Sequence, residues 1–232
     1  MDGQVISHVL LNTYQKLLTH YKSQHWWPAE EPFEVMVGAI LTQSAAWTNV
    51  EKAIANLKNA GALTPKTLRK LPEEEIASLI YPSGYYNAKA RKLKEFVNWL
   101  GERYDDNLSH LFNNNINDLR EQLLSVFGIG EETADSIILY AADKPVFVID
   151  TYTRRFLNRR GLKPPTKTYA AYQTLFMKHL PADNQLFNEY HALLVCLGKD
   201  VCRKNPFCER CCLNATGRRP TEVQYPCSFT PR

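Results

Sequence analysis

The stretch that most constrains the fold is residues 126–150, VFGIGEETADSIILYAADKPVFVID. Gly128-Ile129-Gly130 follows an apolar lead-in, and glycines allow a tight turn with close backbone approach. Residues 131–142 then carry apolar side chains at helical spacing, and Lys144-Pro145 ends the pattern. The pattern predicts a helix–turn–helix that offers unpaired N–H groups to a phosphate, with Asp150 ending an apolar run. A plain helix–turn–helix is the alternative, because short glycine patterns alone are weak evidence.

The rest of the chain also favours helices. Amphipathic patterns predict helices over residues 5–21, 48–60, 169–180 and 186–197. We also expect a buried helix over residues 33–41 and an arginine-rich helix over residues 151–160. No segment alternates apolar and polar residues as a half-buried strand does, so we predict an all-α fold. Residues 105–117 are polar and rich in asparagine, and we predict a loop there.

Composition places few limits on function. The net charge of +4 permits a nucleic-acid partner without requiring one. No apolar run approaches membrane-spanning length and the start of the chain shows no signal-peptide pattern, so we expect a cytoplasmic protein with no membrane partner. Cysteines cluster between Cys196 and Cys212, with Cys227 beyond them. In a reducing compartment this clustering favours metal or iron–sulfur ligation over disulfides.

Two aromatic groups stand outside the helical pattern. Trp26-Trp27-Pro28 and Trp47 form either a hydrophobic plug at a junction or the wall of a base-binding pocket, because flat aromatic faces stack on nucleobases. Residues 81–87, YPSGYYN, predict a turn with three tyrosines, and a basic helix containing Lys89 follows. That helix is either a solvated face or the flank of a loop that wedges into DNA.

Over residues 26–211 these features resemble the endonuclease III-like superfamily of DNA glycosylases. Residues 126–150 resemble the family's helix-hairpin-helix and catalytic aspartate. The resemblance implies that Gly128, Ile129 and Gly130 contact DNA and that Asp150 is catalytic. Leu41-Thr42-Gln43 resembles the family's Leu-x-x-Gln segment, whose glutamine (here Gln43) enters the gap left by an extruded nucleotide.

Residues 84–90 resemble the family's Gly-x-Tyr-Asn-x-Lys-Ala loop. In that loop the second residue wedges into the duplex, which implies this role for Tyr85 and DNA binding for Asn87 and Lys89.

The family's fold implies two helical domains with the DNA cleft between them. Residues 25–133 would form a six-helix domain, and residues 1–24 with 134–232 the second. The implied partner is double-stranded DNA containing a damaged base, bound by a monomer.

Two departures from the family's commoner pattern refine the expected activity. Bifunctional members carry a lysine two residues after the second hairpin glycine, and Glu132 occupies that position here. Because a carboxylate cannot form an imine, we expect glycosylase activity without lyase activity. The tryptophans resemble the helicobacter-type 3-methyladenine glycosylase branch, which stacks the extruded base between aromatic side chains at positions that match Trp26 and Trp47. This resemblance implies that Trp26, Trp27 and Trp47 bind the base.

The resemblance therefore implies base excision of alkylated purines by hydrolysis of the N-glycosidic bond. Such an enzyme extrudes the nucleotide, and the bond breaks through an oxocarbenium-like sugar. The ionised carboxylate of Asp150 can stabilise that positive charge and orient water. A mismatch uracil or thymine glycosylase is one alternative, and a non-catalytic binder of distorted DNA is another.

Three cysteines, Cys202, Cys208 and Cys211, resemble the start of the family's four-cysteine [4Fe–4S] loop. The expected fourth cysteine is absent, because residue 217 is glycine, and Cys227 or Cys212 could replace it. We expect an iron–sulfur cluster with a structural role; zinc or no metal are the alternatives.

Overall fold

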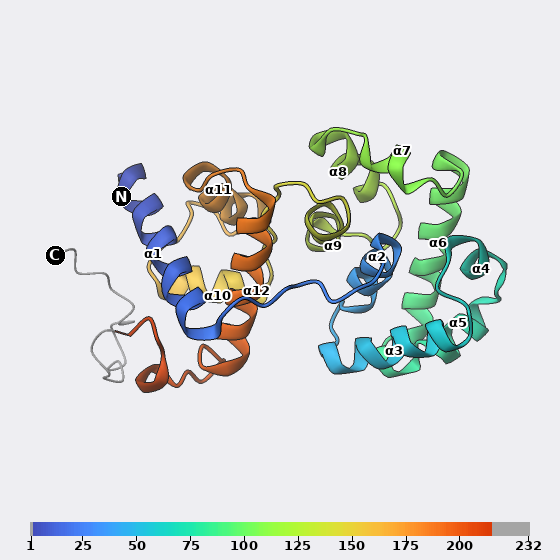
Figure 1. Cartoon of the computed structure of the whole chain (residues 1–232), viewed down its shortest axis with the longest axis horizontal. Helices are drawn as coiled ribbons and strands as arrows, with labels where there is room; N and C mark the ends of the chain where they lie inside the picture. Colours follow the sequence, from blue (N-terminus) through green and yellow to red (C-terminus); the bar gives the residue numbers. More distant parts are fainter. Residues whose placement is uncertain (1, 215–232) are drawn as a thin grey trace. The chain divides into compact units, whose positions relative to one another are not determined.

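Helices dominate the chain. The computed structural model describes residues 2–214, and in this part it contains twelve α-helices, short 3₁₀- and π-helical segments and no β-strand (Figure 1). The all-α prediction is confirmed. The chain divides into two compact units: unit 1 comprises residues 1–26 and 145–232, and unit 2 comprises residues 27–144. No helix within residues 2–214 is long and apolar enough to cross a membrane.

Unit 2 is built around α2, in which almost every residue is buried. The helices of this unit are α2 (Pro32–Leu41), α3 (Trp47–Asn59), α4 (Pro65–Lys70), α5 (Glu73–Leu79), η1 (Tyr81–Ser83), α6 (Tyr86–Tyr104), α7 (Leu108–Phe112), α8 (Ile116–Leu124), α9 (Glu131–Ser136) and η2 (Ile137–Ala141). Helix α2 packs against α3, α6, α9 and η2. A helix that is apolar on all sides is stable when neighbours cover it in this way.

Residues 105–117 contain a helix that the sequence does not predict. Asn107 accepts a hydrogen bond from the N–H of His110 and caps α7, and Asn115 accepts one from the N–H of Asp118 and caps α8. The predicted loop is therefore wrong at α7 and at the start of α8, because asparagine favours helix caps as well as turns. With α7, residues 25–133 contain seven complete α-helices rather than the six expected.

The helix predicted over residues 131–142 changes its hydrogen-bond register midway. After α9 the backbone continues as the π-helical segment η2, and the N–H of Ala142 donates to the carbonyl of Ile137, five residues earlier. Such segments are rare and are often found at functional sites. Lys144 and Pro145 then lead out of the helix, as the sequence predicts.

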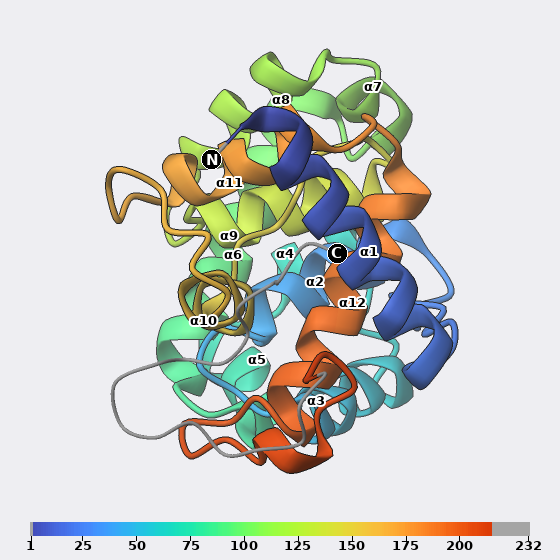
Figure 2. The ribbon, with the colours of Figure 1, turned by 90° about the vertical axis from the view of Figure 1, so that its left-hand side faces the viewer.

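Unit 1 has α12 near its centre. Its helices are α1 (Gly3–Tyr21), α10 (Thr151–Arg159), α11 (Tyr169–His179), α12 (Asn184–Asp200) and the short η3 (Cys208–Arg210). Helices α1 and α10 both pack against α12, and α11 packs against α1 (Figures 1 and 2). The Phe147 ring stacks on that of Phe176, with centroids 3.7 Å apart, and meets Tyr190 edge-on. The apolar run at 146–149 thus passes through the core of this unit.

Candidate functional site

The carboxylate of Asp150 lies where the buried run 146–149 meets the first turn of α10. Its Oδ1 atom accepts a 2.7 Å hydrogen bond from the N–H of Thr153 and so caps the helix. Its Oδ2 atom lies 3.7 Å from Nε2 of His191. Asp150 is 8% exposed, so the carboxylate is held in place while a small part of it stays accessible.

His191 is a residue of this site that the sequence analysis does not predict. It lies in α12 and is buried, and its ring meets that of Phe147 edge-on. Burial lowers the pKa of His191, and the nearby Asp150 carboxylate opposes part of that change. Burial therefore favours the neutral imidazole. In the sequence, one histidine within an apolar helical stripe gives no functional signal.

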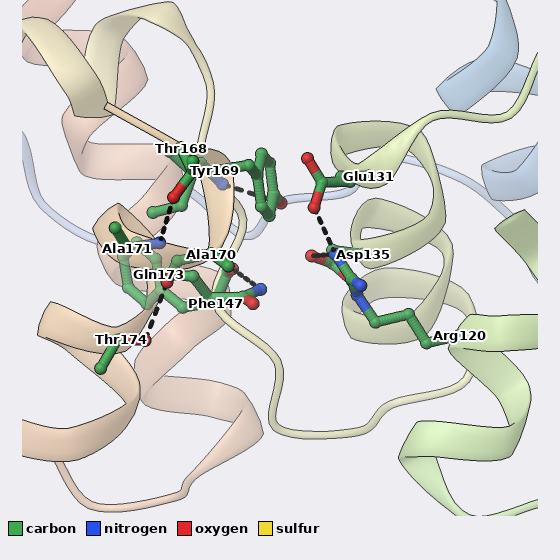
Figure 3. A network of polar contacts seen from close by, with 11 residues as sticks. Arg120, Glu131, Asp135, Phe147, Thr168, Tyr169, Ala170, Ala171, Gln173 and Thr174 are labelled. Carbon is green, nitrogen blue, oxygen red and sulfur yellow. Dashed lines mark hydrogen bonds and ion pairs between the residues drawn. The ribbon is translucent and has the colours of Figure 1, made fainter. Parts of the chain in front are cut away.

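Side chains of α11 hold the segment that leads to Asp150. The N–H of Ile149 donates to the hydroxyl oxygen of Tyr169 at 3.1 Å, and Nε2 of Gln173 donates to the carbonyl of Phe147 at 2.8 Å (Figure 3). The segment belongs to no sheet, so its buried backbone groups need side-chain partners. These contacts fix the approach of the chain to the carboxylate.

Gln43 lies just beyond α2 and is tied to the hairpin. Its Nε2 atom donates to the carbonyl of Gly128 and to Oγ1 of Thr133, both at 3.0 Å. Its Oε1 atom accepts a short hydrogen bond from Nζ of Lys92. The structure thus joins two segments that the sequence analysis assigns to DNA binding.

The predicted wedge loop presents an exposed aromatic side chain. Gly84 and Tyr85 both have positive φ angles, 67° and 48°, and a non-glycine residue in this region is uncommon. Tyr85 is 73% exposed, and Asn87 is exposed in the first turn of α6. The backbone therefore turns Tyr85 into solvent immediately before α6 begins.

Lys89 lies behind this loop and is buried. Its Nζ atom donates to the carbonyl of Leu41 at 2.8 Å and to that of Ser83 at 2.7 Å. Burial, assisted by the charge of Lys92, lowers the pKa of Lys89 to about 8. Lys89 is 2% exposed, so its ammonium group contacts backbone carbonyls rather than solvent. Through these two hydrogen bonds Lys89 connects the end of α2 to the wedge loop.

The hairpin between α8 and α9 has the predicted turn. Gly128 has a φ of 83°, and a Cβ atom there would lie 2.3 Å from Cγ of Lys92, so both backbone angle and space require glycine. Ile129 is buried, and Gly130 is the N-cap of α9. Arg120 of α8 donates to Asp135 of α9 at 2.7 Å, which holds the two hairpin helices together (Figure 3).

Trp27 and Trp47 meet in unit 2. Their ring centroids lie 5.3 Å apart at an interplanar angle of 85°, and Trp27 also meets Tyr140 of η2 edge-on. A Cβ atom at Gly38 of α2 would lie 3.0 Å from the Trp27 ring, so the glycine allows this close packing. Trp26 is half-buried and belongs to unit 1.

A cavity of about 220 Å³ lies against both of these rings. Its lining also includes Glu34, Glu51 and Lys58. Trp47 is half-buried at the first position of α3 and forms part of this wall. Its environment therefore combines aromatic faces with carboxylates.

Three of the predicted metal-ligating cysteines converge in unit 1. Cys202, Cys208 and Cys211 line one small cavity, together with Arg159, whose Nη1 atom donates to Sγ of Cys202 at 3.2 Å. Within residues 2–214, no group of three or more Cys, His, Asp or Glu side chains is arranged to hold a single metal ion.

The two candidates for a fourth ligand differ in what the structure describes. Cys212 follows Cys211 directly but does not line the cavity, and burial raises the pKa of its thiol. Cys227 lies outside the described residues. Cys196 donates from Sγ to Oε1 of Gln24 at 3.0 Å, which places it in a separate contact. Among residues 2–214, three of the predicted ligands, Cys202, Cys208 and Cys211, therefore line the same cavity, whereas a cubane cluster normally uses four thiolates.

Comparison with known proteins decides the family. Residues 37–182 match the model of the HhH-GPD superfamily of base excision DNA repair proteins. The chain belongs to this superfamily. Its fold, the hairpin and the endonuclease III-like relatives described next identify it as a DNA glycosylase that acts in base excision repair and binds DNA.

The relatives include both predicted and structurally defined glycosylases. A predicted DNA repair glycosylase from Methanocaldococcus jannaschii is 42% identical over 88% of this chain and 93% of its own length. Endonuclease III from Thermotoga maritima is 32% identical over 79% of this chain and 81% of its own. The structure of 3-methyladenine DNA glycosylase from Helicobacter pylori, bound to 1,N6-ethenoadenine, matches with a TM-score of 0.69 at 28% identity. That match covers 84% of this chain and 96% of the other.

Proposed function

We propose that this glycosylase removes alkylated purines from double-stranded DNA as a monomeric, monofunctional enzyme without lyase activity. The observation that carries the substrate class is the aromatic pair Trp27 and Trp47, with Trp26 adjacent to the pair in sequence. N3- and N7-alkylated purines are cationic, and cation–π attraction contributes about 0.5–2 kcal/mol per contact. The Helicobacter pylori enzyme described above supports the same substrate class.

The charges around the aromatic pair are consistent with a cationic base. Glu34 and Glu51 contribute two carboxylates to the adjoining cavity, against one ammonium group from Lys58. Lys58 forms ion pairs with Glu34 at 3.0 Å and with Glu30 at 3.3 Å, so carboxylates outnumber the single ammonium group in this region. A neutral pyrimidine gains less from such surroundings.

Asp150 is the catalytic carboxylate in this proposal. A cationic purine leaves without protonation by a general acid, so the main electrostatic demand is the positive charge that develops on the sugar. The Oδ1 atom of Asp150 is held by Thr153, which leaves Oδ2 to face that charge or a water molecule. His191 lies on the Oδ2 side, where its neutral imidazole adds no competing positive charge.

The DNA contacts in the proposal come from unit 2. Tyr85 wedges into the duplex from its exposed position, and Gln43 occupies the gap left by the extruded nucleotide. Asn87 and the hairpin residues 128–130 bind the backbone. Lys89 acts through the loop that it holds, because its ammonium group is buried.

We also propose a [4Fe–4S] cluster held by Cys202, Cys208, Cys211 and Cys227. When bound, the cluster supplies iron–thiolate bonds that cross-link the loop after α12, and it takes no part in base release. The three converging thiols and the Arg159 contact support this assignment. Thiolate ligation also agrees with a cytoplasmic location, where thiols stay reduced.

The test of the substrate class measures base release from methylated duplex DNA, with strand cleavage scored separately. Trp47→Leu keeps bulk but removes the aromatic face, so release of 3-methyladenine or 7-methylguanine should slow by roughly 3- to 30-fold, at about 1.4 kcal/mol per decade. Release from a uracil mismatch should fall less. Equal losses on cationic and neutral substrates, with a lower melting temperature, would show that Trp47 is a core residue and would reopen the mismatch glycosylase alternative.

A further inference from the structure

A basic groove runs along α10 in unit 1. It has a volume of about 550 Å³ and begins at Thr151, the residue after Asp150. Five cationic side chains line it and no carboxylate does: Arg154, Arg155, Arg159, Lys163 and Lys167. The hairpin, the wedge loop and the aromatic cavity contribute no residue to the lining of this groove.

The five cations divide into two kinds. Arg155 donates to the carbonyls of Cys202 and Gly198, and Arg159 contacts Cys202 and the carbonyl of Lys204, so both hold the cysteine loop. The other three cations, Arg154, Lys163 and Lys167, line the groove and make none of these contacts with the cysteine loop.

Arg154, Lys163 and Lys167 form no ion pair with a carboxylate in the part of the chain that the structure describes. The guanidinium of Arg154 lies over the rings of Tyr169 and Tyr172, which fixes its position, whereas Lys163 and Lys167 are exposed. Three positive charges without a paired carboxylate among residues 2–214 suit an external polyanion.

We propose that this groove binds the phosphate backbone of the DNA strand flanking the extruded nucleotide. The assignment rests on the proposed role of Asp150, because the groove starts one residue beyond that carboxylate. Of the three cations that remain, Arg154 lies in α10 and Lys163 and Lys167 lie in the segment after this helix, so the groove takes its cations from both segments. Arginine and lysine contacts of this kind position a strand without reading its sequence.

The test compares two double variants that remove the same charge. Lys163→Gln/Lys167→Gln alters the groove, and Lys66→Gln/Lys70→Gln alters two exposed lysines of α4 as the control. Binding of undamaged duplex is measured from about 50 to 200 mM salt, where each lost phosphate contact reduces the slope of log K against log salt by about 0.9. The groove variant should lose about one to two such contacts and the control none. Equal slopes and equal affinities in the two variants would overturn the proposal.

A second measurement locates the contact. Duplexes containing an uncleavable abasic analogue are trimmed to a few base pairs on one side or the other. The wild-type protein should bind several-fold more weakly when one particular flank is removed, and the groove variant should be insensitive to that removal. Sensitivity that persists in the variant contradicts the assignment. Both measurements report DNA binding rather than base release. They therefore test the groove even if alkylated purines are not the substrate.

Discussion

Asp150 combines a charge with a helix cap, and one substitution separates the two. Asp150→Asn keeps the Oδ1 acceptor for the N–H of Thr153 and removes the negative charge. We expect base release to fall by roughly 10²-fold or more, because one preorganised electrostatic group contributes on this scale. Duplex binding and melting temperature should stay near those of the wild type.

The matched control for this variant is Asp150→Ala, which removes the charge and the cap together. It should lose the same activity and also about 0.5–2 kcal/mol of stability. If Asp150→Asn retains more than about a tenth of the wild-type rate, the catalytic role is wrong.

Lys89 gives the protein a pH dependence of unusual sign for a lysine. Its pKa is about 8 in the folded protein, whereas the pKa of a lysine in an unfolded chain is about 10.4. Between these two values the folded protein has released a proton that the unfolded chain still holds. The free energy of unfolding should therefore rise with pH across this window, and the effect should be constant below pH 8.

Urea denaturation of the wild type and of Lys89→Met at several pH values isolates this contribution, since methionine does not titrate. The stability of the wild type relative to the variant should increase as the pH rises through about 8 towards 10. A difference that stays constant over that range would show that the ammonium group is solvated in solution.

Among the elements, the hairpin carries the most direct chemical test. Glu132 lies in the first turn of α9, two residues after Gly130. Because a carboxylate cannot form a Schiff base with the abasic sugar, borohydride should trap no covalent enzyme–DNA adduct. Strands should break only after alkali or heat, as seen on a denaturing gel. A trapped adduct would identify an amine elsewhere in the chain as a nucleophile and would end the monofunctional proposal.

Elements were more predictable than contacts, for physical reasons. Helical stripes such as residues 5–21 predict their helices because one face must be buried, and the structure confirms α1, α2, α10, α11 and α12. Helix α7 is missed because Asn107 could equally end a helix or begin one. The π-helical segment η2 is missed because its register depends on tertiary packing rather than on local spacing.

Contacts between distant residues carry the least sequence signal. His191 in α12 lies beside Asp150, and neither segment contains a sequence pattern that predicts this contact. In the sequence, Lys89 resembles the other lysines of a basic helix. Only the structure shows that its ammonium group donates to the carbonyls of Leu41 and Ser83. Whether a charged side chain is buried depends on the fold as a whole. The basic sequence around Lys89 therefore suggests a contact with DNA phosphate, whereas its ammonium group contacts backbone carbonyls inside the protein.

For the whole molecule, iron content tests the proposed cluster in the cysteine loop of unit 1. Protein expressed anaerobically with ample iron should be brown, with absorbance at about 400 nm from iron–thiolate ligation. Cys208→Ser should lose both colour and iron, whereas Cys196→Ser should keep them because its sulfur contacts Gln24 instead. A colourless wild-type preparation without iron by elemental analysis would leave zinc or no metal.

The order of the two units along the chain has a consequence for synthesis on the ribosome. Unit 2 occupies one continuous stretch, residues 27–144, whereas unit 1 needs α1 together with α10 to α12. Translation proceeds at about 5–20 residues per second, so α1 emerges first and waits roughly 10–35 seconds for α12, its packing partner. During that wait Val9, Leu10 and Leu17, buried in the finished protein, have no native surface to cover them. Unit 2 should therefore fold first, and α1 should gain its native packing only when α12 has been synthesised.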